Sequence, residues 1–136
     1  LLDLGIPPFL LGSSLNLIMA QRLVRTIDKE TKEIFKPDKT ELKKLGLSSK
    51  SKIKFYKGKP TPQNHNTGYK GRTAIHEILE VTSEIREMIF TGSTESSIKK
   101  KAMKQGMTPL RKAGIDKIED GITTIEEVLR ATVEEN

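Results

Sequence analysis

The chain has 136 residues, of which 35% are hydrophobic and 31% charged, enough apolar material for one modest domain with a core. It contains no cysteine, which excludes a disulfide framework, a thiolate metal site and a cysteine nucleophile. Lysine and arginine exceed aspartate and glutamate by 24 to 18, and the net charge of +6 suits an anionic partner such as nucleic acid, a lipid headgroup or an acidic protein.

The first 27 residues are mostly apolar. Paired prolines at positions 7 and 8 predict an extended or turning backbone there rather than a helix. After Ser13 and Ser14, the apolar residues of the run to Ile27 predict a buried helix. On that helix the polar stripe is narrow and would place three side chains together, facing solvent, an interface or an anion: Gln21, Arg22 and Arg25.

From Asp28 the composition becomes charged, which predicts a new subdomain. Asp38 and Glu41 form a capping-box pattern ahead of a short helix that Gly46 would end. Residues 53–56 and 72–81 read as strands joined by a polar loop, and the simplest expectation is that these two strands pair with each other.

From Thr82 onward the pattern predicts four short helices separated by glycines. Thr82 or Ser83 would cap the first of these helices, and Ser93 or Thr94 the second. Thr108 would cap the third, in which Pro109 occupies the first turn. The last helix carries the capping-box pair Thr124 and Glu127, with Val128 on its inward side.

No stretch of the sequence carries the pattern of an active site, so no catalytic residue is predicted. The phosphate-binding pattern G-x-x-x-x-G-K-[ST] is absent, and Gly58-Lys59 is followed by proline. The two histidines, His65 and His76, lack the cysteine or histidine partners that a zinc centre needs.

Three separated blocks of the sequence together form a specific pattern: LLDLGIPPFLLGSSLNLIMAQRLVR, GYKGRTAIHEILEV and KQGMTPLRKAGIDKIEDGITTIEEVLRAT. In this order they closely resemble the C-terminal region of the ATPases that power type II secretion and type IV pilus assembly. The resemblance implies an α/β fragment in three parts. Residues 1–27 would end a RecA-like ATPase core, residues 28–67 would replace a zinc-binding subdomain, and residues 68–136 would form a strand and a C-terminal bundle of short helices.

Many members of that family carry a zinc site of two C-x-x-C pairs. Aligned on the flanking blocks, those cysteine positions hold other residues here: Asp28, Thr31, Thr61 and Asn64. None of the four offers the soft thiolate that structural zinc prefers, so we expect a metal-free subdomain. Its stability would then come from loop hydrogen bonds and from apolar packing of Ile34, Phe35, Leu42, Leu45, Ile53 and Phe55.

The resemblance also implies a function for the parent enzyme. That enzyme would form a homohexameric ring, bind ATP with magnesium, and move a platform protein at the inner face of the cytoplasmic membrane. The nucleotide motifs of the family (Walker A, Walker B, aspartate box and histidine box) would precede this chain, which should be inactive alone and hold no small-molecule substrate. Gln21, Arg22 and Arg25 would lie near the nucleotide pocket or a neighbouring subunit, the alternative being a solvated surface stripe.

Two other functions remain open. A free-standing basic helical module could bind nucleic acid, although the mixing of lysines with acidic residues after Thr82 disfavours base reading. A separate regulatory partner of an ATPase subunit is the other alternative. Steeply salt-dependent DNA binding would favour the first of these.

Overall fold

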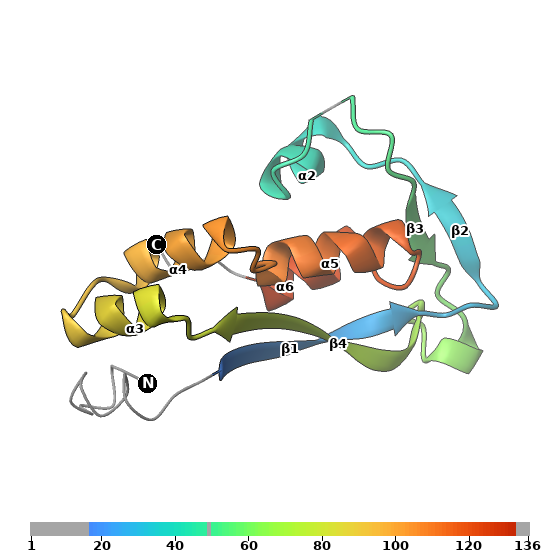
Figure 1. Cartoon of the computed structure of the whole chain (residues 1–136). Coiled ribbons are helices and arrows are strands. Elements are labelled where there is room, and N and C mark those ends of the chain that lie inside the picture. The colour runs from blue at the N-terminus through green and yellow to red at the C-terminus, as the bar shows by residue number, and fades with distance from the viewer. Residues whose placement is uncertain (1–16, 49, 133–136) are drawn as a thin grey trace. The chain divides into compact units, whose positions relative to one another are not determined.

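The computed structural model describes residues 17–48 and 50–132, which form a mixed α/β fold (Figure 1). Its elements in chain order are β1 (Leu17–Ile27), β2 (Lys32–Phe35), α2 (Lys39–Lys44), β3 (Phe55–Gly58), the 3-10 helix η2 (Pro62–Asn64), β4 (Tyr69–Glu80), α3 (Ser83–Phe90), α4 (Glu95–Lys104), α5 (Leu110–Glu119) and α6 (Ile125–Ala131). The mixed α/β class expected from the sequence is confirmed.

The strands form two small sheets, and their pairing differs from the expectation. β1 pairs with β4, and β2 pairs antiparallel with β3 in a register that places Lys32 opposite Gly58 and Phe35 opposite Phe55. The expected pairing of β3 with β4 is therefore wrong, and β2 was missed. Its four residues lie within a run of charged residues, where local periodicity gives no strand signal.

The expected buried helix before Asp28 is also wrong, because its described part is strand β1. Exposure alternates along the strand: the side chains of Leu17 and Met19 are 56% and 55% exposed, whereas Ile18 between them packs on a core. A run this apolar fits either a helix or a covered strand, and pairing with a segment some fifty residues later decided between them. The expected start of the helix, at Ser13 or Ser14, lies outside the described residues.

The described residues fall into two compact units. The first contains residues 17–20 and 77–109, and its core lies around the helices α3 and α4. The side chains of Thr82 and Thr94 cap these helices by accepting bonds from the backbone N–H groups of Ile85 and Ser97, so the threonine is the cap in both pairs that the sequence left open. The buried residues of this core are Val81, Ile85, Ile89, Ile98 and Ala102.

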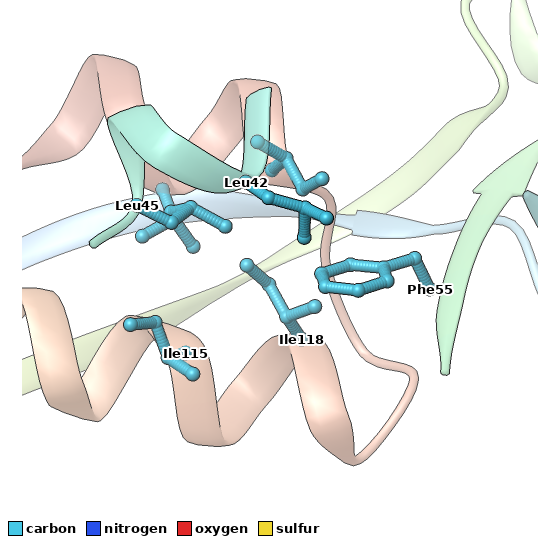
Figure 2. Close-up of a cluster of buried hydrophobic side chains, with 7 residues drawn as sticks. Leu42, Leu45, Phe55, Ile115 and Ile118 are labelled. Atoms are coloured by element: carbon cyan, nitrogen blue, oxygen red, sulfur yellow. The ribbon is translucent and has the colours of Figure 1, made fainter. Parts of the chain in front are cut away.

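The second unit contains residues 21–76 and 110–132, and its core joins α2, β3, α5 and α6. Figure 2 shows Leu42 of α2 and Leu45, the C-cap of that helix, directed toward Phe55 of β3 and toward Ile115 and Ile118 of α5. Ile125 and Val128 of α6 complete this buried cluster.

Most of the apolar packing expected for residues 28–67 is confirmed. Leu42, Leu45 and Phe55 are buried, and Phe35 and Ile53 pack against them. Ile34 is the exception. Its side chain is 71% exposed, because alternation along β2 turns Ile34 away from the face on which Phe35 meets the core.

The capping pattern at the start of α2 is confirmed. The Asp38 carboxylate accepts the Glu41 backbone N–H at 2.8 Å, and the Glu41 side chain accepts the Asp38 backbone N–H at 3.4 Å. Gly46 follows the helix with a positive φ of 79°. Local sequence therefore fixes this helix at both ends.

Candidate functional site

The C-terminal segment before and within α6 closes the outer edge of β1. The Ile27 backbone N–H donates to the Ile122 carbonyl at 2.8 Å, and the Thr123 hydroxyl donates to the Arg25 carbonyl at 2.8 Å. The Arg25 backbone N–H donates to the Glu127 carboxylate at 2.6 Å. Edge groups of β1 that an adjacent strand would otherwise satisfy are thus bonded to residues about a hundred positions later.

Glu127 lies at the centre of this contact and is fully buried. Its Oε1 is 3.1 Å from Arg25 Nε and 3.1 Å from Arg130 Nη2, and its Oε2 accepts from both arginines at 3.2 Å. Both arginines therefore bind one carboxylate in the forked geometry that guanidinium groups favour. We call Arg25, Glu127 and Arg130 the Glu127 cluster, which carries two positive charges and one negative charge.

Burial and hydrogen bonding act in opposite directions on this carboxyl. Burial alone would raise the pKa of Glu127, but the hydrogen bonds from Arg130 and Arg25 outweigh it and lower the pKa from 4.5 to about 2. The same bonds to Glu127 raise the pKa of each arginine. The cluster is therefore fully ionised at neutral pH.

Tyr69, at the start of β4, contacts both Arg25 of the cluster and the cap of α6. The Arg25 guanidinium lies 4.1 Å from the centroid of the Tyr69 ring, close enough for a cation–π contact. The Tyr69 hydroxyl lies 2.7 Å from the hydroxyl of Thr124, which caps α6. Burial is the main cause that raises the pKa of Tyr69, so its hydroxyl stays protonated. These contacts fix Arg25 in one orientation.

The three predicted polar residues do not form one stripe. In strand β1 the side chains of Gln21 and Arg25 share a face, and Arg22 points to the other, whereas a helix would have grouped all three. Gln21 and Arg22 are exposed, and Arg22 Nη1 donates to the Gln21 carbonyl at 2.9 Å. Arg25 instead belongs to the Glu127 cluster.

Two surface depressions adjoin the cluster, and both have arginine in their lining. One has a volume of about 520 Å³ and is lined by Gln21, Arg22, Leu23, Arg130 and Ala131. The other has a volume of about 410 Å³ and is lined by Arg25, Thr67, Tyr69, Gly71 and Arg72. The predicted trio therefore borders two basic depressions, which suit acidic groups.

Sequence reasoning missed three members of this arrangement: Tyr69, Glu127 and Arg130. Glu127 was assigned only its capping-box role, which is confirmed on the N-cap side, since the Glu127 backbone N–H donates to Thr124 Oγ1 at 3.2 Å. Its position beside buried Val128 was the available signal, because a carboxylate on the inward side of a helix requires a partner.

A second polar centre forms where the two turns flanking β2 and β3 meet. Asn64 is 2% exposed, and its side-chain Nδ2 donates to Asp28 Oδ2 at 2.9 Å. The same nitrogen lies 3.5 Å from Thr31 Oγ1, and Asn64 Oδ1 accepts the Thr61 backbone N–H at 2.9 Å. Asp28, Thr31, Thr61 and Asn64, which we expected at the cysteine positions of the resembling family, are thus brought together in space.

Comparison with known proteins identifies the family. Residues 1–130 match the model of the type II/IV secretion system protein family. The chain belongs to this family. It is 42% identical to the type IV pilus assembly ATPase of Thermus thermophilus, over 97% of this chain and 15% of the relative. It is 40% identical to the type II secretion system ATPase E of Vibrio cholerae, over 97% of this chain and 26% of the relative.

A third relative, type II secretion system protein E of Pseudomonas aeruginosa, is 37% identical over 99% of this chain and 27% of its own length. The chain therefore spans roughly a quarter or less of the secretion and pilus ATPases that it matches. Among residues 17–48 and 50–132, no helix combines the length and apolar character needed to cross a bilayer.

The zinc site that the family implies does not fit the residues of this chain. The four aligned positions supply one carboxylate, two hydroxyls and one amide, whereas structural zinc takes thiolate or imidazole ligands. The amide nitrogen of Asn64 donates toward the Asp28 and Thr31 oxygens, and a donor nitrogen cannot ligate a metal. Elsewhere among the described residues, three or more metal-ligating side chains do not gather.

Proposed function

We propose that this chain is the C-terminal portion of a hexameric motor ATPase that drives type II secretion or type IV pilus assembly. The family match over residues 1–130 carries the proposal. In the parent enzyme, residues 1–27 end the RecA-like core, residues 28–67 form a metal-free counterpart of the zinc subdomain, and residues 68–136 form the C-terminal subdomain. ATP and magnesium bind to the core that precedes this chain.

The chain contributes subunit contacts and coupling rather than chemistry. Arg25 and Arg130 share one carboxylate, so the Glu127 cluster keeps an excess positive charge beside two depressions. Arg22 and Arg72 add exposed charges to the linings of these depressions. Acidic groups of a neighbouring subunit or of the nucleotide pocket fit this distribution, since arginine binds carboxylate and phosphate groups in a forked geometry.

The location follows from this role. The ring would act at the inner face of the cytoplasmic membrane, where a platform protein would receive the motion of its subunits. Nucleic acid is a disfavoured partner, because Arg22, Arg25 and Arg72 lie on strands. Arg130 lies on helix α6 but is bound to Glu127 rather than displayed for base reading.

The first test is genetic and simple. The gene upstream of the codon for Leu1 should encode an in-frame G-x-x-x-x-G-K-[ST] motif followed by an acidic Walker B strand. A start codon at that place would instead favour a separate regulatory partner of an ATPase subunit.

The second test uses the full-length enzyme. Arg22→Ala and Arg72→Ala remove exposed charges outside the Glu127 cluster, and each should lower ATP turnover or ring assembly by about tenfold if these depressions receive acidic groups. Lys100→Ala, an exposed charge on α4, is the matched control and should leave both unchanged. Full turnover and full assembly in both arginine variants would end the assignment of these depressions to subunit contacts.

A further inference from the structure

We propose that the side-chain amide of Asn64 takes the place of the family's metal ion in this chain. The metal would join the turn at residues 28–31 to the loop at residues 61–68, and here one buried side chain joins the same two segments. The inference concerns a cross-link within residues 28–68 and stands apart from the proposed motor function.

The amide of Asn64 is bonded on both of its polar atoms. Its Nδ2 donates to Asp28 Oδ2 and to the Lys59 carbonyl, both at 2.9 Å, so both N–H groups have acceptors. Its Oδ1 accepts the backbone N–H groups of Thr61 at 2.9 Å and Gly68 at 3.1 Å, which uses both lone pairs. A single amide therefore reaches its full bonding capacity while it is 2% exposed.

The backbone around Asn64 is arranged to converge on it. The Asp28 backbone N–H donates to the Gly68 carbonyl at 3.0 Å, and the Lys59 backbone N–H donates to the Thr31 carbonyl at 3.2 Å. Gly58 and Gly68 pass so closely that a Cβ on Gly58 would lie 1.9 Å from the Gly68 oxygen. The two segments are therefore in backbone contact, as the two ligand-bearing turns of a metal clip would be.

The loop needs this support because its backbone is unfavourable without it. His65 and Asn66 adopt φ values of 55° and 60°, a left-handed conformation that most side-chain-bearing residues avoid and that histidine and asparagine tolerate better than most. The surrounding bonds must hold such a conformation in place. The bonds from Asn64 to Thr61 and Gly68 flank these two residues on both sides and hold the loop closed.

The Asp28 carboxylate completes the cross-link. Besides the Asn64 amide, it accepts the Glu30 backbone N–H at 3.1 Å. The hydrogen bond from Asn64, followed by that from Glu30, lowers the pKa of Asp28. Because a neutral amide and an ionised carboxylate need no metal and no free thiol, the cross-link should withstand chelators and thiol oxidation, to which a zinc–cysteine site is sensitive.

Hydrogen–deuterium exchange of the full-length protein tests the proposal locally. In the unmodified protein, peptides that cover residues 25–31 and 59–69 should exchange at the same rate with and without EDTA or added zinc. Asn64→Ala should speed exchange of these peptides by about tenfold or more, since the Thr61 and Gly68 amides lose their acceptor. Peptides from α4 should not change.

Two further variants keep the test decisive. Gln63→Ala alters an exposed neighbour in η2 and is the matched control, with exchange expected to match the unmodified protein. Asn64→Asp keeps the shape and the one oxygen that accepts from Thr61 and Gly68. It replaces the donor nitrogen by a second carboxylate oxygen, which opposes the Asp28 carboxylate and the Lys59 carbonyl. It should release residues 25–31 while residues 61 and 68 stay protected, even if Asn64→Ala fails to fold.

Three outcomes would overturn the inference. One is stoichiometric zinc in the purified protein together with faster exchange in EDTA, which would mean that a metal supports the loop. Another is faster exchange on removal of a hard cation such as calcium by EGTA, which would assign the oxygen atoms to that ion. The last is unchanged exchange in both Asn64 variants.

Discussion

Two polar cross-links hold the second unit, and they work by different chemistry. The Glu127 cluster buries a carboxylate between two arginines, whereas the Asn64 link buries a neutral amide against one carboxylate and backbone groups. A buried charge requires a charged partner, and its contribution depends on pH and on salt. A neutral amide requires only a full set of hydrogen bonds. The comparison teaches that distant segments can be joined through a buried neutral amide as well as through a cluster of opposite charges.

We expect the largest effect when the residues of the Asn64 link are replaced by a metal site. Replacing Asp28, Thr31, Thr61 and Asn64 together by cysteine should create a tetrathiolate site, because the structure already brings these positions together. Structural zinc supplies about 10–16 kcal/mol in small domains, so residues 28–67 should become zinc-dependent. Cobalt binding with a thiolate absorption band would report the site. A variant with cysteines at positions 28 and 31 only should bind far more weakly.

Removing the centre of the first cross-link should have the next largest effect. Glu127→Ala leaves the Arg25 backbone N–H and two partly exposed arginines without this acceptor, and the free energy of unfolding should fall by about 2–3 kcal/mol. Urea unfolding monitored by circular dichroism measures the loss. Glu126→Ala, an exposed neighbour on α6, should cost less than about 0.5 kcal/mol. Equal losses in the two variants would contradict the importance of the cluster.

Acid should also weaken the Glu127 cluster. The folded pKa of Glu127 is about 2 against 4.5 for the free group, so below pH 4.5 the unfolded state binds more protons than the folded state. The stability from Glu127 is present above about pH 4.5 and is lost as the pH falls toward 2. Unfolding measured from pH 6 to pH 3 should therefore show a steep decline that becomes shallower in Glu127→Gln. A Glu127→Gln profile as steep as that of the unmodified protein would contradict this assignment.

We expect the smallest effect when the hydrogen bond between Tyr69, which lies beneath Arg25, and Thr124 is removed. Tyr69→Phe removes the hydroxyl that meets Thr124 at 2.7 Å but keeps the ring beneath the guanidinium. The expected loss is about 1 kcal/mol, the usual contribution of one hydrogen bond. Tyr56→Phe is the matched control, because the Tyr56 ring also lies beneath a cation, with Lys32 Nζ 4.7 Å from its centroid. A loss of more than about 3 kcal/mol would show that the ring contact itself had been disturbed.

Sequence reasoning located the helices more reliably than the strands. The capping residues Asp38, Thr82, Thr94 and Thr124 all cap helices in the structure, because an N-cap bond spans only two or three residues. The apolar segment that ends at Ile27 was misread, since its neighbours in the sequence allow either a helix or a strand. The strand that pairs with β1 lies some fifty residues later in the chain, and no local sequence pattern indicates it.

The candidate site shows the same division. The sequence indicates Arg25 as a candidate because it is a polar residue within an apolar run. It indicates four further residues through alignment on the resembling blocks: Asp28, Thr31, Thr61 and Asn64. The sequence could not show that Glu127 binds Arg25, because 102 positions separate them. Nor could it show that Asn64 is the residue whose side chain supplies the expected loop hydrogen bonds between the two turns of the cysteine-free subdomain.

By itself, the sequence determined the mixed α/β class, the order of the C-terminal helices with their caps, the family and the absence of thiolate ligands. These features depend on composition, short-range hydrogen bonds and motif order, all of which are local. Only the tertiary structure decided that residues 17–27 form a strand, that Glu127 is buried between two arginines, and that Asn64 joins the turn at residues 28–31 to the loop at residues 61–68. Each of those depends on contacts between distant segments, which form because buried polar groups and open strand edges must find partners.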